Sequence, residues 1–90
     1  MPRPCKRRRI RGTPNSNYFK PAGIRTIELE EIVLSSSEFE ALRLKDVEEY
    51  DQKTCAEKME ISQPTFHRII TVARKKVSEA LVKGKAIQIE

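Results

Sequence analysis

Residues 52–71, QKTCAEKMEISQPTFHRIIT, predict a short helix, a tight turn and a second helix. Small or apolar residues stand wherever two such helices would pack together: Cys55, Ala56, Met59, Ile61, Phe66 and Ile69. Ser62 stands where the second helix needs an N-cap. Other early residues of that helix share its outward face: Gln63, Pro64, His67, Arg68 and Thr71. This pattern is typical of a helix-turn-helix.

A leading helix is predicted before this stretch. Ser37 and Glu40 have the spacing of a capping box, so the helix is expected to begin after Ser37 and to run to about Glu49. Its apolar stripe is predicted to comprise Phe39, Leu42 and Val47, with Ala41 and Leu44 beside it. Asp51 is the expected N-cap of the next helix, over roughly 52–60.

The last helix is predicted to start at Gln63 and to stop at Gly84. Pro64 is tolerated because amide hydrogens in the first turn of a helix have no acceptor within the helix, so the one that proline lacks costs no hydrogen bond. The expected buried side contains Phe66, Ile69, Ile70, Ala73, Val77, Ala80 and Leu81. Short strands are predicted at 26–30 and 86–89, and these could pair with each other or across a dimer.

The predicted fold is therefore mainly α: a helix-turn-helix bundle of three helices with a long C-terminal recognition helix. Residues 24–90 would form this domain, and residues 1–23 an extended basic arm. The arm holds four of the five prolines and two of the three glycines. Tyr18 and Phe19 could contact a nucleic-acid groove, but docking on the core is favoured because large apolar side chains rarely stay free.

Charge is segregated along the chain. Residues 1–23 carry seven Lys or Arg and no acid. Residues 24–62 carry five basic and eleven acidic residues, and residues 63–90 carry six basic and two acidic ones. Positive charge on the arm and the last helix, with negative charge on the support, would orient the domain on a polyanion.

Other function classes receive little support. The two cysteines, Cys5 and Cys55, form no CxxC pair and His67 is not in ligand spacing with either, so we expect no zinc site and no cofactor. A disulfide between them is possible by count alone. No apolar run is long enough to span a membrane, and no nucleophile and base stand at a recognised spacing. We expect a cytoplasmic protein that is not an enzyme.

In a helix-turn-helix the early residues of the second helix reach base edges in the major groove. Gln63 is suited to adenine, and Arg68 to guanine or phosphate. Thr65 and Thr71 could touch a thymine methyl or a phosphate, although Thr65 also has the spacing to serve the helix start. His67 could donate or accept a hydrogen bond, or simply face solvent.

Two basic runs could contact phosphate. Arg74, Lys75 and Lys76 are consecutive on a helix and therefore cannot all face one groove. Arg7, Arg8 and Arg9 of the arm could enter a minor groove, follow the backbone or bind RNA.

Taken together, these segments resemble a small prokaryotic family, domain of unknown function 134, described as predicted DNA-binding proteins. The matching stretches are PRPCKRRR, YFKPAG, LEEIVLSSSEFEALRLKD, the helix-turn-helix and ARKKVSEALVKGKAIQIE. The resemblance implies a helix-turn-helix similar to region 4 of sigma-70-type factors. A glycine commonly occupies the turn slot held here by Glu60, so Glu60 must accept a left-handed backbone at a cost of about 1 kcal/mol, or change the turn.

The sequence thus predicts a sequence-specific double-stranded DNA-binding protein, a transcriptional regulator, expected to act as a homodimer. The dimer interface would be the helix after Ala73 or the terminal strands. Two alternatives remain open: a protein-interaction module on the transcription machinery, with RNA polymerase as a partner, and nonspecific RNA binding through the arm.

Overall fold

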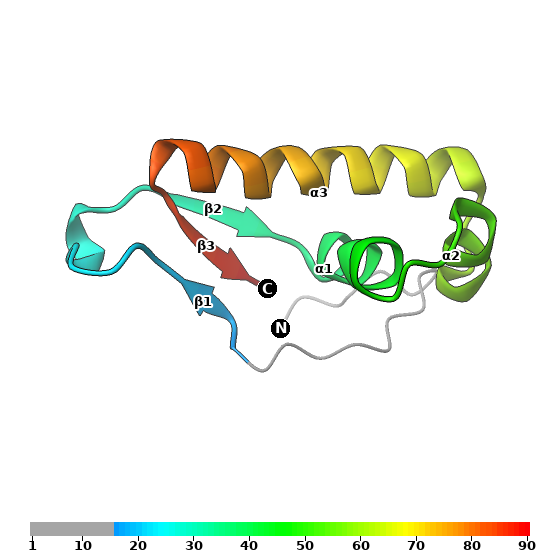
Figure 1. Ribbon diagram of the computed structural model, residues 1–90, viewed down its shortest axis with the longest axis horizontal. Helices are drawn as coiled ribbons and strands as arrows, with labels where there is room; N and C mark the ends of the chain where they lie inside the picture. Colours follow the sequence, from blue (N-terminus) through cyan, green and yellow to red (C-terminus); the bar gives the residue numbers. More distant parts are fainter. Residues whose placement is uncertain (1–15) are drawn as a thin grey trace.

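The computed structural model describes residues 16–90, which form three α-helices and a small three-stranded sheet. The elements in chain order are β1 (Tyr18–Phe19), a 3-10 turn η1 (Thr26–Glu28), β2 (Glu31–Leu34), α1 (Ser36–Leu42), a π-helical turn η2 (Arg43–Val47), α2 (Gln52–Met59), α3 (Gln63–Lys83) and β3 (Ala86–Ile89). α3 runs along the whole molecule, with the sheet beneath its C-terminal half and α1 and α2 beneath its N-terminal half (Figure 1). The mainly α prediction is confirmed.

The sheet joins the two ends of the described chain. Its strand order is β1-β3-β2, with β1 antiparallel and β2 parallel to β3. Phe19 lies opposite Ile87, and Leu34 lies opposite Ile89. The predicted strand at 86–89 is confirmed, and it pairs within the chain. The docking predicted for Tyr18 and Phe19 is confirmed in part: the two residues form an edge strand of this sheet, but the Phe19 side chain remains 53% exposed.

The strand predicted over 26–30 is wrong. The Glu28 N–H donates to the Arg25 carbonyl at 2.9 Å in a 3-10 turn, and the strand begins only at Glu31. The reason is burial: the Ile27 side chain is 85% exposed, so its alternation with Leu29 has no core to pack against.

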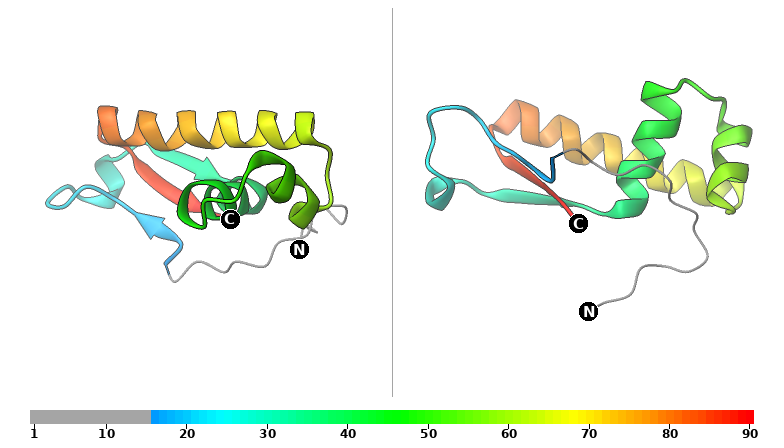
Figure 2. Two further views of the ribbon diagram at one scale, coloured as in Figure 1. Left: turned by 45° about the vertical axis from the view of Figure 1, so that its right-hand side comes forward. Right: turned by 90° about the horizontal axis from the view of Figure 1, so that it is seen from below.

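The core consists of two clusters, both of which use α3. The first lies between α1, η2, α2 and the start of α3, and contains Ala41, Leu44, Cys55, Ala56, Met59, Phe66 and Ile70. The second lies between α3 and the sheet, and contains Leu34, Ala73 and Ile89. Burying one large side chain of this kind contributes about 1.5–3 kcal/mol. The first cluster therefore fixes α2 against the N-terminal half of α3. Figure 2 shows the arrangement of the helices from two further directions.

The capping box predicted for Ser37 and Glu40 is wrong by two residues. The N-cap is Ser35: its hydroxyl accepts from the Glu38 N–H at 3.1 Å, and its own N–H donates to the Glu38 carboxylate at 2.9 Å. α1 therefore begins directly after Ser35. Glu40 is 1% exposed and forms an ion pair with Arg43 instead, so the packing of Glu40 selects between two boxes of equal spacing.

Two residues predicted to be buried are exposed. The π-helical turn, in which the Glu48 N–H donates to the Arg43 carbonyl at 2.9 Å, changes the rotation per residue, so the apolar stripe of α1 does not continue. Val47 is 72% exposed, and Leu44 takes the buried position. Leu81 is 76% exposed, because the buried line of α3 passes through Ala80 at this end. The predicted stop at Gly84 is confirmed, since Gly84 has φ 70° and ends α3.

Candidate nucleic-acid interface

Residues 60–62 connect α2 to α3 and determine how the second helix leaves the first. Glu60 has φ 60° and ψ 45°, a left-handed conformation. Its N–H donates to the Glu57 carbonyl at 3.1 Å, and the Ile61 N–H donates to the Ala56 carbonyl at 3.0 Å. These bonds satisfy two of the last four carbonyls of α2, those of Ala56 and Glu57. Of the two alternatives for Glu60, the chain adopts the left-handed backbone.

Side-chain caps define the first turn of α3. The Ser62 hydroxyl accepts from the Thr65 N–H at 3.2 Å, which confirms Ser62 as the N-cap. Pro64 lies in this turn, where its missing N–H breaks no intrahelical bond. The Gln52 side-chain amide donates to the Gln63 carbonyl at 3.3 Å and so connects the start of α2 to the start of α3. The orientation of α3 is therefore set by local hydrogen bonds as well as by the core.

The start of α2 is capped as predicted. The Asp51 carboxylate accepts from the Thr54 N–H at 2.7 Å, and this bond lowers the pKa of Asp51 below its ordinary value. The Cys55 thiol is buried and donates to the Tyr50 carbonyl at 3.7 Å. Burial raises the pKa of Cys55, so the thiol is suited to packing rather than to nucleophilic chemistry.

The first half of α3 presents most of the predicted contact residues to solvent. The exposed ones are Gln63, Pro64, His67, Arg68 and Thr71. Thr65 is half-buried. Because residues three and four apart share a helix face, Pro64, Arg68, Thr71 and Lys75 form one outward line. Lys75 is therefore in line with Arg68 and Thr71, whereas Gln63 lies on a neighbouring face of α3.

Arg68 is held in place by its neighbours. Its guanidinium donates to the Thr65 hydroxyl oxygen at 3.2 Å, and the Ser62 hydroxyl donates to the same oxygen at 2.9 Å. The Thr71 hydroxyl donates to the His67 carbonyl at 2.7 Å. These bonds limit the rotamers of Arg68 and Thr71, which reduces the entropy lost when a ligand is bound.

The three consecutive basic residues of α3 diverge, as expected from helix geometry. The Arg74 guanidinium donates to both Asp46 carboxylate oxygens, at 2.6 and 3.1 Å, which raises the pKa of Arg74 and lowers that of Asp46. The Lys76 ammonium donates to the Val33 carbonyl and to the Glu38 carboxylate, each at 2.8 Å. Lys75 lies between them and is exposed. Of the three, Lys75 is therefore the residue best placed to meet an external anion.

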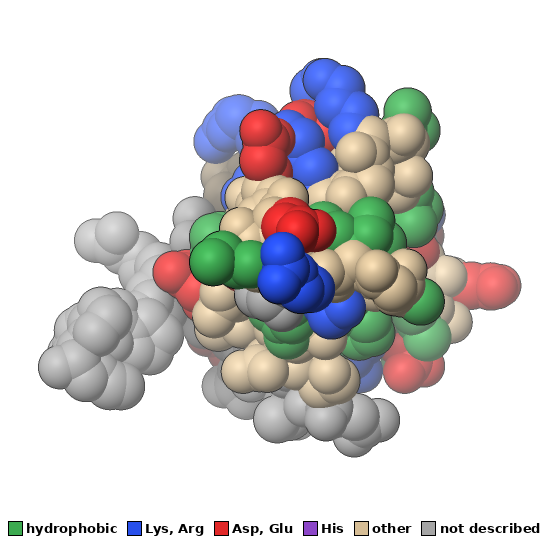
Figure 3. Space-filling model, turned by 90° about the vertical axis from the view of Figure 1, so that its left-hand side faces the viewer, with side chains coloured by type: hydrophobic (Ala, Val, Ile, Leu, Met, Phe, Trp, Pro, Cys, Tyr) green, Lys and Arg blue, Asp and Glu red, His purple; other side chains and the backbone are tan. Residues whose placement is uncertain are grey.

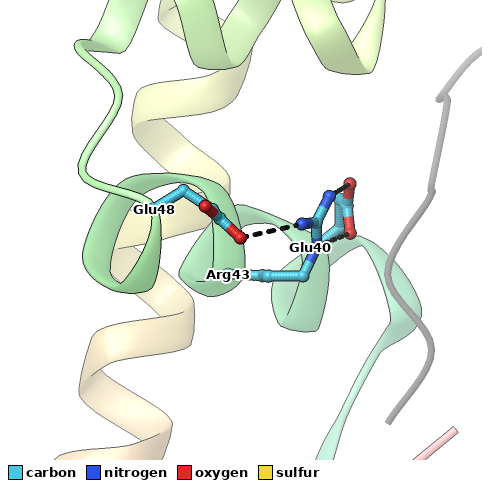
Figure 4. Close-up of polar contacts among 3 residues, drawn as sticks. All are labelled: Glu40, Arg43 and Glu48. Atoms are coloured by element: carbon cyan, nitrogen blue, oxygen red, sulfur yellow. Dashed lines mark hydrogen bonds and ion pairs between the residues drawn. The ribbon is translucent and has the colours of Figure 1, made fainter.

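Three charged side chains, Glu40, Arg43 and Glu48, contact one another along α1 and the π-helical turn η2 (Figure 4). The Arg43 guanidinium donates to both carboxylate oxygens of Glu40, at 3.0 and 2.8 Å, and lies 3.5 Å from Glu48. The hydrogen bonds that Arg43 donates to Glu40 raise the pKa of Arg43. Glu40 is almost fully buried, so it depends on this partner. Sequence reasoning missed the pair, although the three-residue spacing of Glu40 and Arg43 on a helix was a usable signal.

The electrostatics of the exposed face are one-sided. Residues 61–78 contain Arg68, Arg74, Lys75 and Lys76 but no Asp or Glu. Acidic residues are concentrated in the segments before Ile61. Because Arg74 and Lys76 are paired with Asp46 and Glu38, the positive charge that α3 presents to solvent here comes from Arg68 and Lys75, and this charge suits a polyanion.

Other sites find no support among residues 16–90. In that range no three His, Cys, Asp or Glu side chains gather closely enough to hold a metal ion. None of the helices in the described part of the chain is long and apolar enough to cross a membrane. Arg7, Arg8 and Arg9, like Cys5, lie outside the described residues.

The comparison with known proteins gives the family. The model of the family described as "Protein of unknown function DUF134" matches residues 1–90. The chain belongs to this family. No solved structure matches the chain.

Curated relatives carry the family designation UPF0251. The chain is 56% identical over 90 residues to the UPF0251 protein of Caldanaerobacter subterraneus subsp. tengcongensis, covering 100% of the chain and 76% of that protein. It is 53% identical over 90 residues to one from Thermoanaerobacter pseudethanolicus, again covering 100% of the chain and 76% of the relative. It is 58% identical over 89 residues to one from Clostridium botulinum strain 657, covering 99% of the chain and 57% of the relative.

Proposed function

We propose that this chain binds double-stranded DNA sequence-specifically, with the N-terminal half of α3 in the major groove, and regulates transcription. The observation that carries the proposal is the exposed, acid-free face of α3 around Arg68, held by a three-residue turn against α2. A helix presented in this way fits the major groove, and its early residues reach base edges. The proposal includes the expected similarity to region 4 of sigma-70-type factors.

The proposed contacts divide into base-reading and phosphate-binding residues. Arg68 would donate to guanine O6 and N7, and Gln63 would pair with adenine. Pro64, His67 and Thr71 would lie against the groove wall. Lys75 would bind a phosphate, because it stands on the same outward line further along α3. Arg74 is a weaker candidate, since Asp46 already occupies both arms of its guanidinium.

Thr65 serves two roles in this proposal. Its N–H is bound by the Ser62 cap, and its hydroxyl oxygen accepts from Arg68. The residue therefore orients Arg68 toward the start of α3, where a recognition helix makes base contacts. The arm residues Arg7, Arg8 and Arg9 would add phosphate or minor-groove contacts and so increase the dependence of affinity on salt.

Selection of bound fragments from random duplex DNA tests the proposal. The unaltered chain should enrich one motif at moderate salt, and Arg68→Ala should relax one position of it. Arg25→Ala is the matched control, because Arg25 is an equally basic, exposed residue that pairs with Glu28 far from α3 in the chain. Its motif should be unchanged.

Each of the other outcomes points to a different function. Absence of any enriched motif would contradict the proposal. Binding that survives Arg68→Ala but fails when residues 1–12 are removed would indicate nonspecific nucleic-acid binding through the arm. Capture of RNA polymerase without duplex binding would favour a protein-interaction module.

A further inference from the structure

The end of the molecule opposite the α2–α3 turn has exposed apolar side chains. Leu81 and Val82, near the end of α3, are 76% and 83% exposed, and Phe19 of β1 is 53% exposed. Figure 3 views the molecule from this end and shows hydrophobic side chains at the surface among charged ones. Scattered apolar side chains are ordinary, but here Phe19 and Leu81 line a defined hollow.

Two hollows adjoin at this end. One, of about 320 Å³, is lined by Phe19, Lys20, Pro21, Ala80, Leu81, Gly84, Lys85 and Ile87. The other, of about 520 Å³, is lined by Ile24, Glu28, Leu29, Glu30, Lys83, Gly84 and Lys85. Gly84 and Lys85 line both hollows, so the two adjoin at these residues. We call this surface, comprising the two hollows with Leu81 and Val82, the end face.

We propose that the end face binds a second copy of this chain and forms a two-fold symmetric dimer. Self-association requires a surface that carries both the projection and the recess it fills. The end face has both: Leu81 and Val82 project from α3, and the hollow beside Leu81 is lined largely by apolar side chains. A partner of different shape would not need both features on one patch.

The charges of the end face favour the same partner. Lys85 is paired with Glu79 at 2.8 Å and with Glu30 at 3.2 Å, so its charge is already compensated. The second hollow has acidic Glu28 and Glu30 together with basic Lys83. Glu28 is paired with Arg25 and Glu30 with Lys85, so a second copy would approach a surface whose acidic charges are already compensated within the chain. A surface with both signs is complementary to itself, whereas a nucleic acid or a strongly charged protein would require one sign.

The position of the end face would allow a dimer to bind two half-sites of DNA at once. This step rests on the proposed function. Arg68 and Leu81 are separated by about 20 Å along α3, at 1.5 Å per residue. A two-fold axis near Leu81 would thus allow the two Arg68 side chains to lie up to about 40 Å apart. Half-sites one turn of DNA apart, at about 34 Å, fall within that reach.

Sedimentation equilibrium over a range of concentrations tests the dimer. The chain of 10.4 kDa should sediment at twice that mass as its concentration rises. The double change Leu81→Glu and Val82→Glu should weaken the dimer at least about 30-fold, as expected for removal of central interface residues. Val72→Glu is the matched control: it introduces the same charge at a 45% exposed valine of α3 that lines neither hollow, and should leave dimerisation unchanged.

Circular dichroism of all variants is the check that each of them remains folded. A single mass of 10.4 kDa at every concentration, or equal loss of the dimer with Val72→Glu, would overturn the inference. Duplex selection separates this result from the proposed function. A monomer that enriches a single half-site would refute the dimer alone, while a dimer that enriches no motif would refute DNA recognition alone.

Discussion

Replacing Glu60 by glycine is expected to stabilise this protein. Glu60 has φ 60° and ψ 45°, where the Cβ of an L-residue crowds the following carbonyl oxygen at a cost of about 1–2 kcal/mol. Glycine avoids this cost but adds freedom to the unfolded chain, which removes about 0.4–1 kcal/mol of the gain. The net gain should be about 0.5–1 kcal/mol, or a rise in Tm of about 2–8 °C for a domain of this size.

Glu57→Gly is the matched control for this prediction. It makes the same chemical change three residues earlier, at an exposed position inside α2 with helical backbone. There glycine should cost about 1 kcal/mol, because the left-handed strain is absent and only the entropy term remains. Urea unfolding followed by circular dichroism measures both variants. If Glu60→Gly destabilised the protein as much as Glu57→Gly, the left-handed turn between α2 and α3 would be refuted.

Three further predictions concern charge and packing. Arg74 lowers the pKa of Asp46, so their ion pair stabilises the fold above about pH 4, and this stability is lost as the pH falls through the lowered pKa. In urea unfolding, Asp46→Asn should therefore be less stable than the unaltered chain at neutral pH, and should lose less stability than that chain when the pH is lowered. In duplex binding, Lys75→Ala should reduce the salt slope by about 0.9, and Arg74→Ala by less, because Asp46 holds Arg74; an equal or larger effect of Arg74 would contradict the assignment. In urea unfolding, Met59→Ala should cost about 2–5 kcal/mol and Val47→Ala less than about 0.5 kcal/mol, since only Met59 is buried.

The parts of the fold predictable from the sequence are those set by local rules. Asp51 and Ser62 are flanked by helix-forming residues and no competing cap, so both N-caps and the start of α3 follow directly. Gly84 ends α3 for a similar reason. The turn at Glu60 was also identified as the exception, because a non-glycine residue in that slot must adopt an uncommon backbone.

Tertiary contacts decided what local rules could not. Ser35 and Ser37 each have a glutamate three residues later, and only the burial of Glu40 beside Arg43 selects Ser35 as the cap. The parallel pairing of β2 with β3 joins segments separated by three helices, a relation that four-residue strands do not encode by themselves.

The candidate interface also has features that local rules predict and features that depend on tertiary contacts. The outward face of α3 follows from a helical period of 3.6 residues, and the structure gives the predicted exposure for Gln63 and Arg68. The difference between Arg74 and Lys75 could not be predicted, because Asp46 reaches Arg74 from 28 residues away in the chain.

Sequence-specific reading of duplex DNA by α3 is tested most directly by one ratio of affinities. Fluorescence anisotropy would measure binding of the selected duplex and of a scrambled duplex of equal length, at one salt concentration. For the unaltered chain the account predicts a ratio of at least about 1,000, with a loss of about 5- to 150-fold in Arg68→Ala and no loss in Arg25→Ala. A ratio near one for the unaltered chain, or equal losses in both arginine variants, would contradict it.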